Sequence, residues 1–193
     1  MSDWTLEDLE NWDTKICELG LKNELDWYPI TYETCDYFEM IGNMSYHGMP
    51  THYGHWSFGK SFEIQSSQYQ HGATGLPYEL IINSDPCISY LMKENPLYLQ
   101  ILIMAHCVGH SDFFKNNRMF QYTRADTIVP RMRNAKKRIQ KYVEDPWIGI
   151  EKVEAVIDAC QALSYQIPKH PVDYGSLKEE YDRQHASSED KHQ

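Results

Sequence analysis

The sequence predicts a mostly helical α+β domain, with a small sheet of short strands packed beside a long central helix. Most of the chain carries apolar residues at intervals of three or four, as helices do, whereas the clearest strand pattern is confined to residues 78–83. The chain has 193 residues, of which 41% are hydrophobic and 24% charged, as in a globular protein with its own core. We expect one domain over residues 1–168 and a polar, disordered tail over residues 169–193.

The first helix is expected over residues 3–19. Its apolar residues recur every three or four positions and would form one face: Leu9, Trp12, Ile16 and Leu19. Ser2 or Asp3 can cap its start, and Gly20 can end it. Residues 27–34 alternate loosely between apolar and polar and are expected to form a short extended segment.

The middle of the chain begins with a stretch that has neither a helical nor a strand period. Residues 42–59 contain four Gly and three His among aromatic residues, so we expect a structured loop there. A helix is expected over residues 60–69. The strand over residues 78–83 stops at the turn formed by residues 84–86, and a short helix is expected over residues 88–93.

The long central helix is expected over residues 96–116, because Asn95 precedes Pro96 as a cap residue precedes a proline in the first turn. Six residues at helical spacing would share its apolar face: Leu99, Leu102, Ile103, His106, His110 and Phe113. Two more helices are expected over residues 125–143, with a defect near Pro130, and over residues 149–164.

Charge and composition limit the classes of function. The net charge of -10 arises from 18 basic and 28 acidic side chains, which disfavours binding to nucleic acid or to an anionic membrane. The helix over residues 125–143 is locally basic, which indicates a solvated face or a site for an acidic partner. No signal peptide is visible, and the longest apolar run, residues 101–105, is too short to span a bilayer. We therefore expect a cytoplasmic protein whose five Cys are reduced.

The sharpest chemical feature is a pair of histidines, His106 and His110, four positions apart on the long helix. Their Cβ atoms would lie about 6 Å apart on one face, so both rings could bind one metal ion such as zinc. This is the spacing of the zinc-protease motif H-E-x-x-H, but Cys107 replaces the Glu that acts as general base. The alternative is a pair of buried His satisfied by hydrogen bonds.

A zinc site needs at least one more protein ligand. Spacing does not rank the candidates for it, which are Glu79, Asp85, Asp112, His52 and His55. Glu79 is also our candidate for a catalytic carboxylate.

Other candidate groups lie outside the histidine pair. The loop histidines His47, His52 and His55, with Trp56 and Lys60, could bind a metal, move protons or stack on a ligand, or the loop aromatics could simply pin the loop to the core.

Two further segments carry polar side chains of chemical interest. Asp85 and Cys87 flank a proline at the end of the strand, and Cys87 would be nucleophilic only if its pKa were lowered. Asn116 falls in a segment that reads best as the C-terminal cap of the long helix. The chain has no P-loop, Rossmann or G-x-S-x-G motif.

Several strings resemble the stage V sporulation protein R (SpoVR) family in order and spacing. They are Tyr46 to Pro50 (YHGMP), His55 to Lys60 (HWSFGK), Tyr78 to Cys87 (YELIINSDPC) and Met104 to Asn117, and the resemblance covers residues 5–165. It implies a role in forming the spore cortex, a peptidoglycan layer. Relatives in bacteria that make no spores imply instead a link to a serine protein kinase in stress or stationary phase.

Family members are usually much longer, and a Glu in their later half resembles the third ligand of a zincin-type site. The resemblance then implies that His106 and His110 are the first two ligands, while that Glu has no counterpart here. Three hypotheses follow. The first is a zincin-like half-site with hydrolase ancestry, completed by a second segment or chain. The second is a non-catalytic assembly or regulatory protein. The third is a thiol enzyme that uses Cys87 or Cys107.

Overall fold

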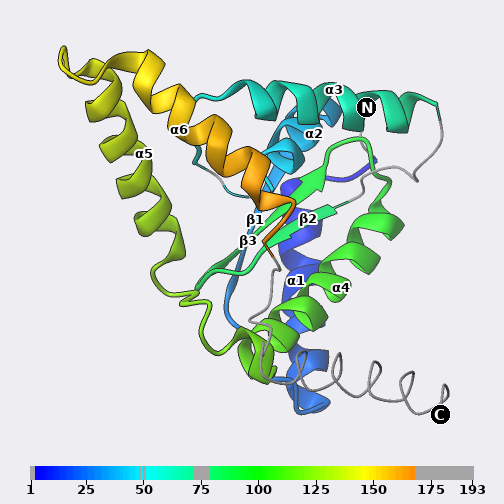
Figure 1. Ribbon diagram of the computed structural model, residues 1–193. Helices are drawn as coiled ribbons and strands as arrows, with labels where there is room; N and C mark the ends of the chain where they lie inside the picture. Colours follow the sequence, from blue (N-terminus) through cyan, green and yellow to red (C-terminus); the bar gives the residue numbers. More distant parts are fainter. Residues whose placement is uncertain (1–2, 48, 50, 72–78, 168–193) are drawn as a thin grey trace, which may run out of the picture. The chain divides into compact units, whose positions relative to one another are not determined.

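The computed structural model describes residues 3–47, 49, 51–71 and 79–167 (Figure 1). Within these residues it contains six α-helices, one short 3-10 helix and a three-stranded sheet, which confirms the expected mostly helical α+β fold. The chain divides into two compact units, residues 1–150 and 151–193. The expected tail over residues 169–193 lies outside the described residues.

Helix α1 (Leu6–Lys22) begins later than expected, because its N-cap is Thr5 and not Ser2 or Asp3. The Thr5 hydroxyl accepts a hydrogen bond from the backbone N–H of Asp8 at 3.2 Å, and the Asp8 carboxylate accepts one from the backbone N–H of Thr5 at 2.8 Å. The helix also continues past Gly20. This glycine is buried against Trp27, and a Cβ there would lie 3.1 Å from the indole ring.

The sheet has the order β1 (Ile30–Cys35), β3 (Cys87–Met92), β2 (Glu79–Ile82), with β3 parallel to β1 and antiparallel to β2. The expected extended segment and the expected strand are thus confirmed, although Tyr78 lies outside the described residues. The short helix expected over residues 88–93 was wrong, because this segment is the central strand. A six-residue apolar run has the same pattern in a buried strand as in a short helix.

Side chains that alternate along the strands build two cores, one on each face of the sheet. Leu91 packs against α1 and the long helix α4 (Leu97–Asn116), in a cluster that also contains Ile81. Tyr90 and Met92 point to the opposite face, where they pack in a cluster with Met40 of helix α2 (Tyr37–Ser45). Figure 1 shows α1 and α4 on one side of the sheet. Glu79, two residues before Ile81, therefore faces α4.

The loop expected over residues 42–59 is shorter than predicted. Helix α2 (Tyr37–Ser45) begins at its own capping box, formed by Asp36 and Glu39, and covers the first four of those residues. Helix α3 (Trp56–Gln70) begins four residues before the position at which we expected it, because His55 provides its N-cap. Helices α2 and α3 pack on each other.

The buried face of α4 differs from the one we predicted. Its buried residues are Gln100, Ile103, Met104, Cys107, Val108 and Ser111. Leu102 and Phe113, which we expected in the core, are 66% and 51% exposed. Small polar side chains take their place because they fit closely against small residues of β3: Ser111 contacts Cys87, and Cys107 contacts Ser89.

Beyond α4 the chain forms a short 3-10 helix, η1 (Arg118–Phe120), and then α5 (Ile128–Glu144). Pro130 lies in the first turn of α5, where a backbone N–H is not needed, so the expected defect is absent. Helix α6 (Gly149–Ser164) forms the described part of the second unit almost entirely. No helix of the described residues combines the length and the apolar character that a membrane span requires.

Candidate metal centre

Three side chains from two elements converge on one point of the surface of the first unit. Glu79 is the first residue of β2, and His106 and His110 lie in the middle of α4. The distance from Glu79 Oε1 is 3.3 Å to His106 Nε2 and 3.7 Å to His110 Nε2. One ligand atom from each of the three residues lies within 4.8 Å of the other two. The two imidazole rings have centroids 4.4 Å apart and planes at 80°.

These distances match those between ligands of one small cation. Two donors that are each about 2.1 Å from a tetrahedral Zn²⁺ lie roughly 3.4 Å apart. Both contacts also fall within the distance range of ion pairs, and the 3.7 Å from Glu79 Oε1 to His110 Nε2 exceeds the normal range of a hydrogen bond. Two imidazoles and one carboxylate form the ligand set of several catalytic zinc sites, which keep a fourth position for water or substrate.

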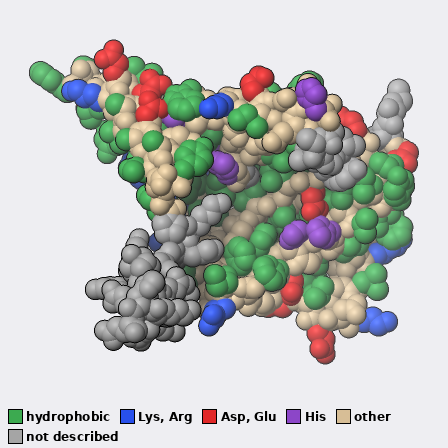
Figure 2. Space-filling view, turned by 45° about the vertical axis from the view of Figure 1, so that its right-hand side comes forward, with side chains coloured by type: hydrophobic (Ala, Val, Ile, Leu, Met, Phe, Trp, Pro, Cys, Tyr) green, Lys and Arg blue, Asp and Glu red, His purple; other side chains and the backbone are tan. Residues whose placement is uncertain are grey.

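The exposure of the side chains tests whether the two histidines form a buried, hydrogen-bonded pair. His106 and His110 are 59% and 40% exposed, and Glu79 is 21% exposed. The pair is therefore not a buried one that is satisfied by hydrogen bonds, the alternative considered from the sequence. Figure 2 shows His side chains at the surface of this face, among hydrophobic side chains.

The other oxygen of Glu79 has a different partner. The Cys107 thiol donates a hydrogen bond to Glu79 Oε2 over 3.5 Å, and Ser89 Oγ lies 3.2 Å from Cys107 Sγ. Burial raises the pKa of Cys107 to about 12, and it also raises the pKa of Cys87. A nucleophilic cysteine needs a lowered pKa, so both shifts argue against the thiol enzyme.

Two of the loop candidates, His52 and His55, lie away from this cluster and contact the ring of Phe58. His52 stacks on Tyr46 with ring centroids 5.1 Å apart, and its Nε2–H donates to the backbone carbonyl of Tyr46 at 2.7 Å. Burial lowers the pKa of His52. His55 caps α3, since its Nδ1 accepts a hydrogen bond from the backbone N–H of Ser57.

The remaining loop candidates lie on the surface. His47 is exposed. Trp56 is 51% exposed, and the Lys60 ammonium lies 5.9 Å from the centre of its ring. None of the five loop candidates joins the cluster of Glu79, His106 and His110 in the described part of the chain.

Asp112 and Asn116 make hydrogen bonds that hold the backbone of a neighbouring segment. The Asp112 carboxylate accepts a hydrogen bond from the backbone N–H of Asp26 at 2.8 Å, and the Asn116 amide donates to the backbone carbonyl of Asp26 at 2.7 Å. Together they tie the segment before β1 to the end of α4. Asp85 has an exposed side chain, and Cys87 is buried beside Ser111.

Comparisons with known proteins agree with the resemblance seen in the sequence. A family model described as SpoVR like protein matches residues 3–193. A protein of Escherichia coli (strain K12), named uncharacterized protein YcgB, is 41% identical over 191 residues. The match covers 97% of this chain but 37% of that relative, so the chain spans little more than a third of its length. No solved structure matches the chain significantly.

Proposed function

This chain belongs to the SpoVR family, and from that premise we propose that it is a metal-binding protein whose Glu79, His106 and His110 bind Zn²⁺ in a centre of hydrolase type. The observation that carries the proposal is the position of Glu79 Oε1, 3.3 and 3.7 Å from two imidazole nitrogens one helical turn apart. The carboxylate comes from β2 and the rings from α4, and the convergence of these three side chains supports the proposal.

The ligand set suits zinc better than a hard cation. Two imidazole nitrogens and one carboxylate oxygen are ligands that Zn²⁺ prefers, whereas Mg²⁺ and Ca²⁺ favour sites built from oxygen alone. A bound zinc would supply a Lewis acid and an activated water. By the family resemblance, we propose peptide or peptidoglycan bonds as the substrate class.

Among the described residues at this centre, we propose three ligands, but the general base of the zinc-protease motif is not present. Cys107 occupies the position of the Glu in H-E-x-x-H, and it is fully buried. A Glu there would place a second carboxylate in the core beside Glu79, which is costly without a cationic partner. We propose that the base comes from a second segment or chain that covers the centre.

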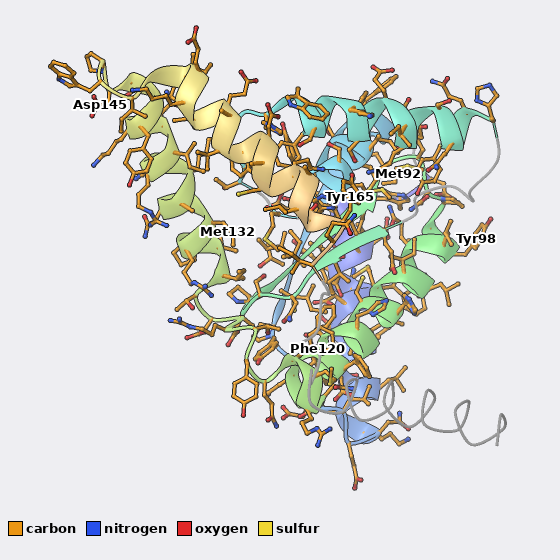
Figure 3. All side chains as sticks on the ribbon, viewed as in Figure 1. Met92, Tyr98, Phe120, Met132, Asp145 and Tyr165 are labelled. Carbon is orange, nitrogen blue, oxygen red and sulfur yellow. The ribbon has the colours of Figure 1, made fainter. Side chains whose placement is uncertain are left out.

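The face of α4 around the centre carries exposed apolar side chains, which a covering segment or chain could bury. Tyr98 and Leu102 precede the histidines along α4, Phe113 follows them, and these three side chains are 51% to 74% exposed. Figure 3 shows Tyr98 projecting from α4 away from the sheet. The chain spans 37% of the length of its Escherichia coli relative. The hydrolytic activity that we propose is therefore that of a longer protein of the family.

A non-catalytic assembly or regulatory role is the second candidate, and the missing base favours it. Helix α5 supports it as well, since its exposed surface carries six basic side chains in an acidic protein: Arg131, Arg133, Lys136, Lys137, Arg138 and Lys141. The partners we propose are cytoplasmic proteins, either of spore cortex formation or of the serine kinase system that the family resemblance implies.

Elemental analysis of purified protein after dialysis against zinc tests the proposal. We expect about one zinc per chain, and less than a tenth of that in the double variant His106→Ala/His110→Ala. The matched control is His71→Ala, since His71 is exposed at the end of α3 and belongs to no cluster of metal ligands in the described residues. If the wild-type protein holds no stoichiometric metal, either alone or within a longer family member, the metal proposal fails and the regulatory one remains.

A further inference from the structure

The two oxygens of the Glu79 carboxylate have different surroundings. Oε1 faces the two imidazole nitrogens, at 3.3 and 3.7 Å. Oε2 faces the core, where it accepts a hydrogen bond from Cys107 Sγ over 3.5 Å. A carboxylate that binds a metal through one oxygen leaves the other free for a partner in the protein, and such partners commonly orient metal ligands.

The hydrogen bonds around Cys107 have a definite direction. An ionised carboxylate only accepts hydrogen bonds, so the single thiol hydrogen of Cys107 points to Glu79 Oε2. The Ser89 hydroxyl, 3.2 Å from Cys107 Sγ, must then be the donor in that contact. A chain of donors runs from Ser89 through Cys107 to Glu79, and it connects β3, α4 and β2.

We propose that Cys107 is a positioning residue of the metal centre: its thiol fixes the Glu79 carboxylate with Oε1 directed at the metal, and Ser89 fixes the thiol. This inference rests on the proposed function. A Glu side chain turns about three single bonds, and Glu79 lies at the first position of its strand. Cys107 and Ser89, both 0% exposed, provide a rigid reference for it.

Cys107 lies between the two histidine ligands in sequence. Its side chain approaches the centre from the protein interior, whereas the histidines approach it from the solvent side. It belongs to the buried face of α4, whereas the histidines belong to the exposed side. The helix therefore presents the metal ligands outward, and one residue after the first of them it presents the group that holds the third ligand.

The test compares three variants by zinc competition with a chromophoric chelator. Cys107→Ala removes the donor and should weaken zinc binding about 10–100-fold, the usual effect of losing an outer partner. Cys107→Ser keeps a donor and should restore the affinity to within about threefold of the wild type. The matched control is Cys87→Ala, because Cys87 is equally buried and contacts a serine, Ser111, at 3.4 Å. That variant should bind zinc as the wild type does.

Cobalt substitution provides a second readout, which a merely structural role would not change. If Cys107 only positions Glu79, the Co²⁺ form of the wild type shows d–d bands without a sulfur-to-cobalt charge-transfer band. A charge-transfer band that disappears in Cys107→Ala would make the thiol a ligand and overturn the positioning role. Equal zinc affinity in Cys107→Ala and the wild type would overturn it too. No zinc or cobalt binding by the wild type would instead refute the proposed function on which it rests.

Discussion

The carboxylate of Asp3 accepts a hydrogen bond from the backbone N–H of Leu97, 2.9 Å away and 94 residues later in the chain. Asp3 thus does for α4 what we expected it to do for α1. Pro96, the N-cap of α4, has no side-chain donor or acceptor, and a carboxylate is favourable at the positive end of a helix. Asp3→Ala should lower the free energy of unfolding by about 1 kcal/mol, measured by urea denaturation. Asp3→Asn, which keeps an acceptor oxygen, should recover most of this loss, and equal stability of Asp3→Ala and the wild type would contradict the role.

The contact between Gly20 and Trp27 makes a second prediction about stability. A Cβ on Gly20 would lie 3.1 Å from two ring carbons of Trp27 and 3.7 Å from a methyl group of Val108. Gly20→Val should therefore destabilise the protein by roughly 2 kcal/mol through overpacking, despite the better helix propensity of valine. Gly59→Val in α3 is the control, since a Cβ there meets no atom within 4 Å. Thermal unfolding of both variants would measure the difference, and a Gly20→Val protein as stable as the control would show that Trp27 can move aside.

Zinc should stabilise the folded protein if the three ligands bind it. At a free concentration one hundred times its Kd, a ligand that binds the folded state alone adds about 2.7 kcal/mol to the free energy of unfolding. We expect this gain in the wild type and not in Glu79→Gln, which keeps the shape of the side chain but loses its charge. Differential scanning calorimetry with and without zinc would measure it. An equal gain in both proteins would place the zinc elsewhere.

The free energy of unfolding of the protein should depend on pH through His52. Burial holds the pKa of this imidazole below its ordinary value in the folded state, so the unfolded state binds the proton more readily. The stabilising contribution is therefore fully present above the unfolded pKa of about 6.5 and is lost as the pH falls towards the folded value. His52→Gln keeps an N–H donor but does not titrate. Its free energy of unfolding should fall less than that of the wild type between pH 7.5 and 5.5, and parallel curves would contradict the prediction.

The periodicity of apolar residues predicted those helices and strands that are long or that have clear residues at their ends. The helix that carries His106 and the strand before Ser84 were both expected close to their actual positions. Segment 87–92 was misassigned, because only its neighbours β1 and β2 make it a strand. The core face of α4 was also misassigned, since Cys107 and Ser111 are small and polar yet buried, which follows from close packing on β3.

The candidate site was predictable only in part. Helical geometry places His106 beside His110, so the sequence was enough for the pair. The third member of the cluster depends on where β2 starts relative to α4, which no helical period determines, and Glu79 therefore stood unranked among five candidates. The period of two along β2 was a usable signal, because it places Glu79 on the same face as Ile81.

The order of strands in the sheet has a consequence for how the chain acquires its structure. β3 is the last strand to be synthesised, yet it lies between the other two, and β1 and β2 make no ladder with each other. Among the described residues, a nascent chain that has not reached Cys87 therefore lacks the partner with which both β1 and β2 pair. Residues 30 and 87, which pair across the parallel ladder, are 57 positions apart, and contacts of such long range slow the search for the native topology. On the ribosome, the sheet can form only once β3 has been synthesised, and the placement of Glu79 on the sheet depends on the same step.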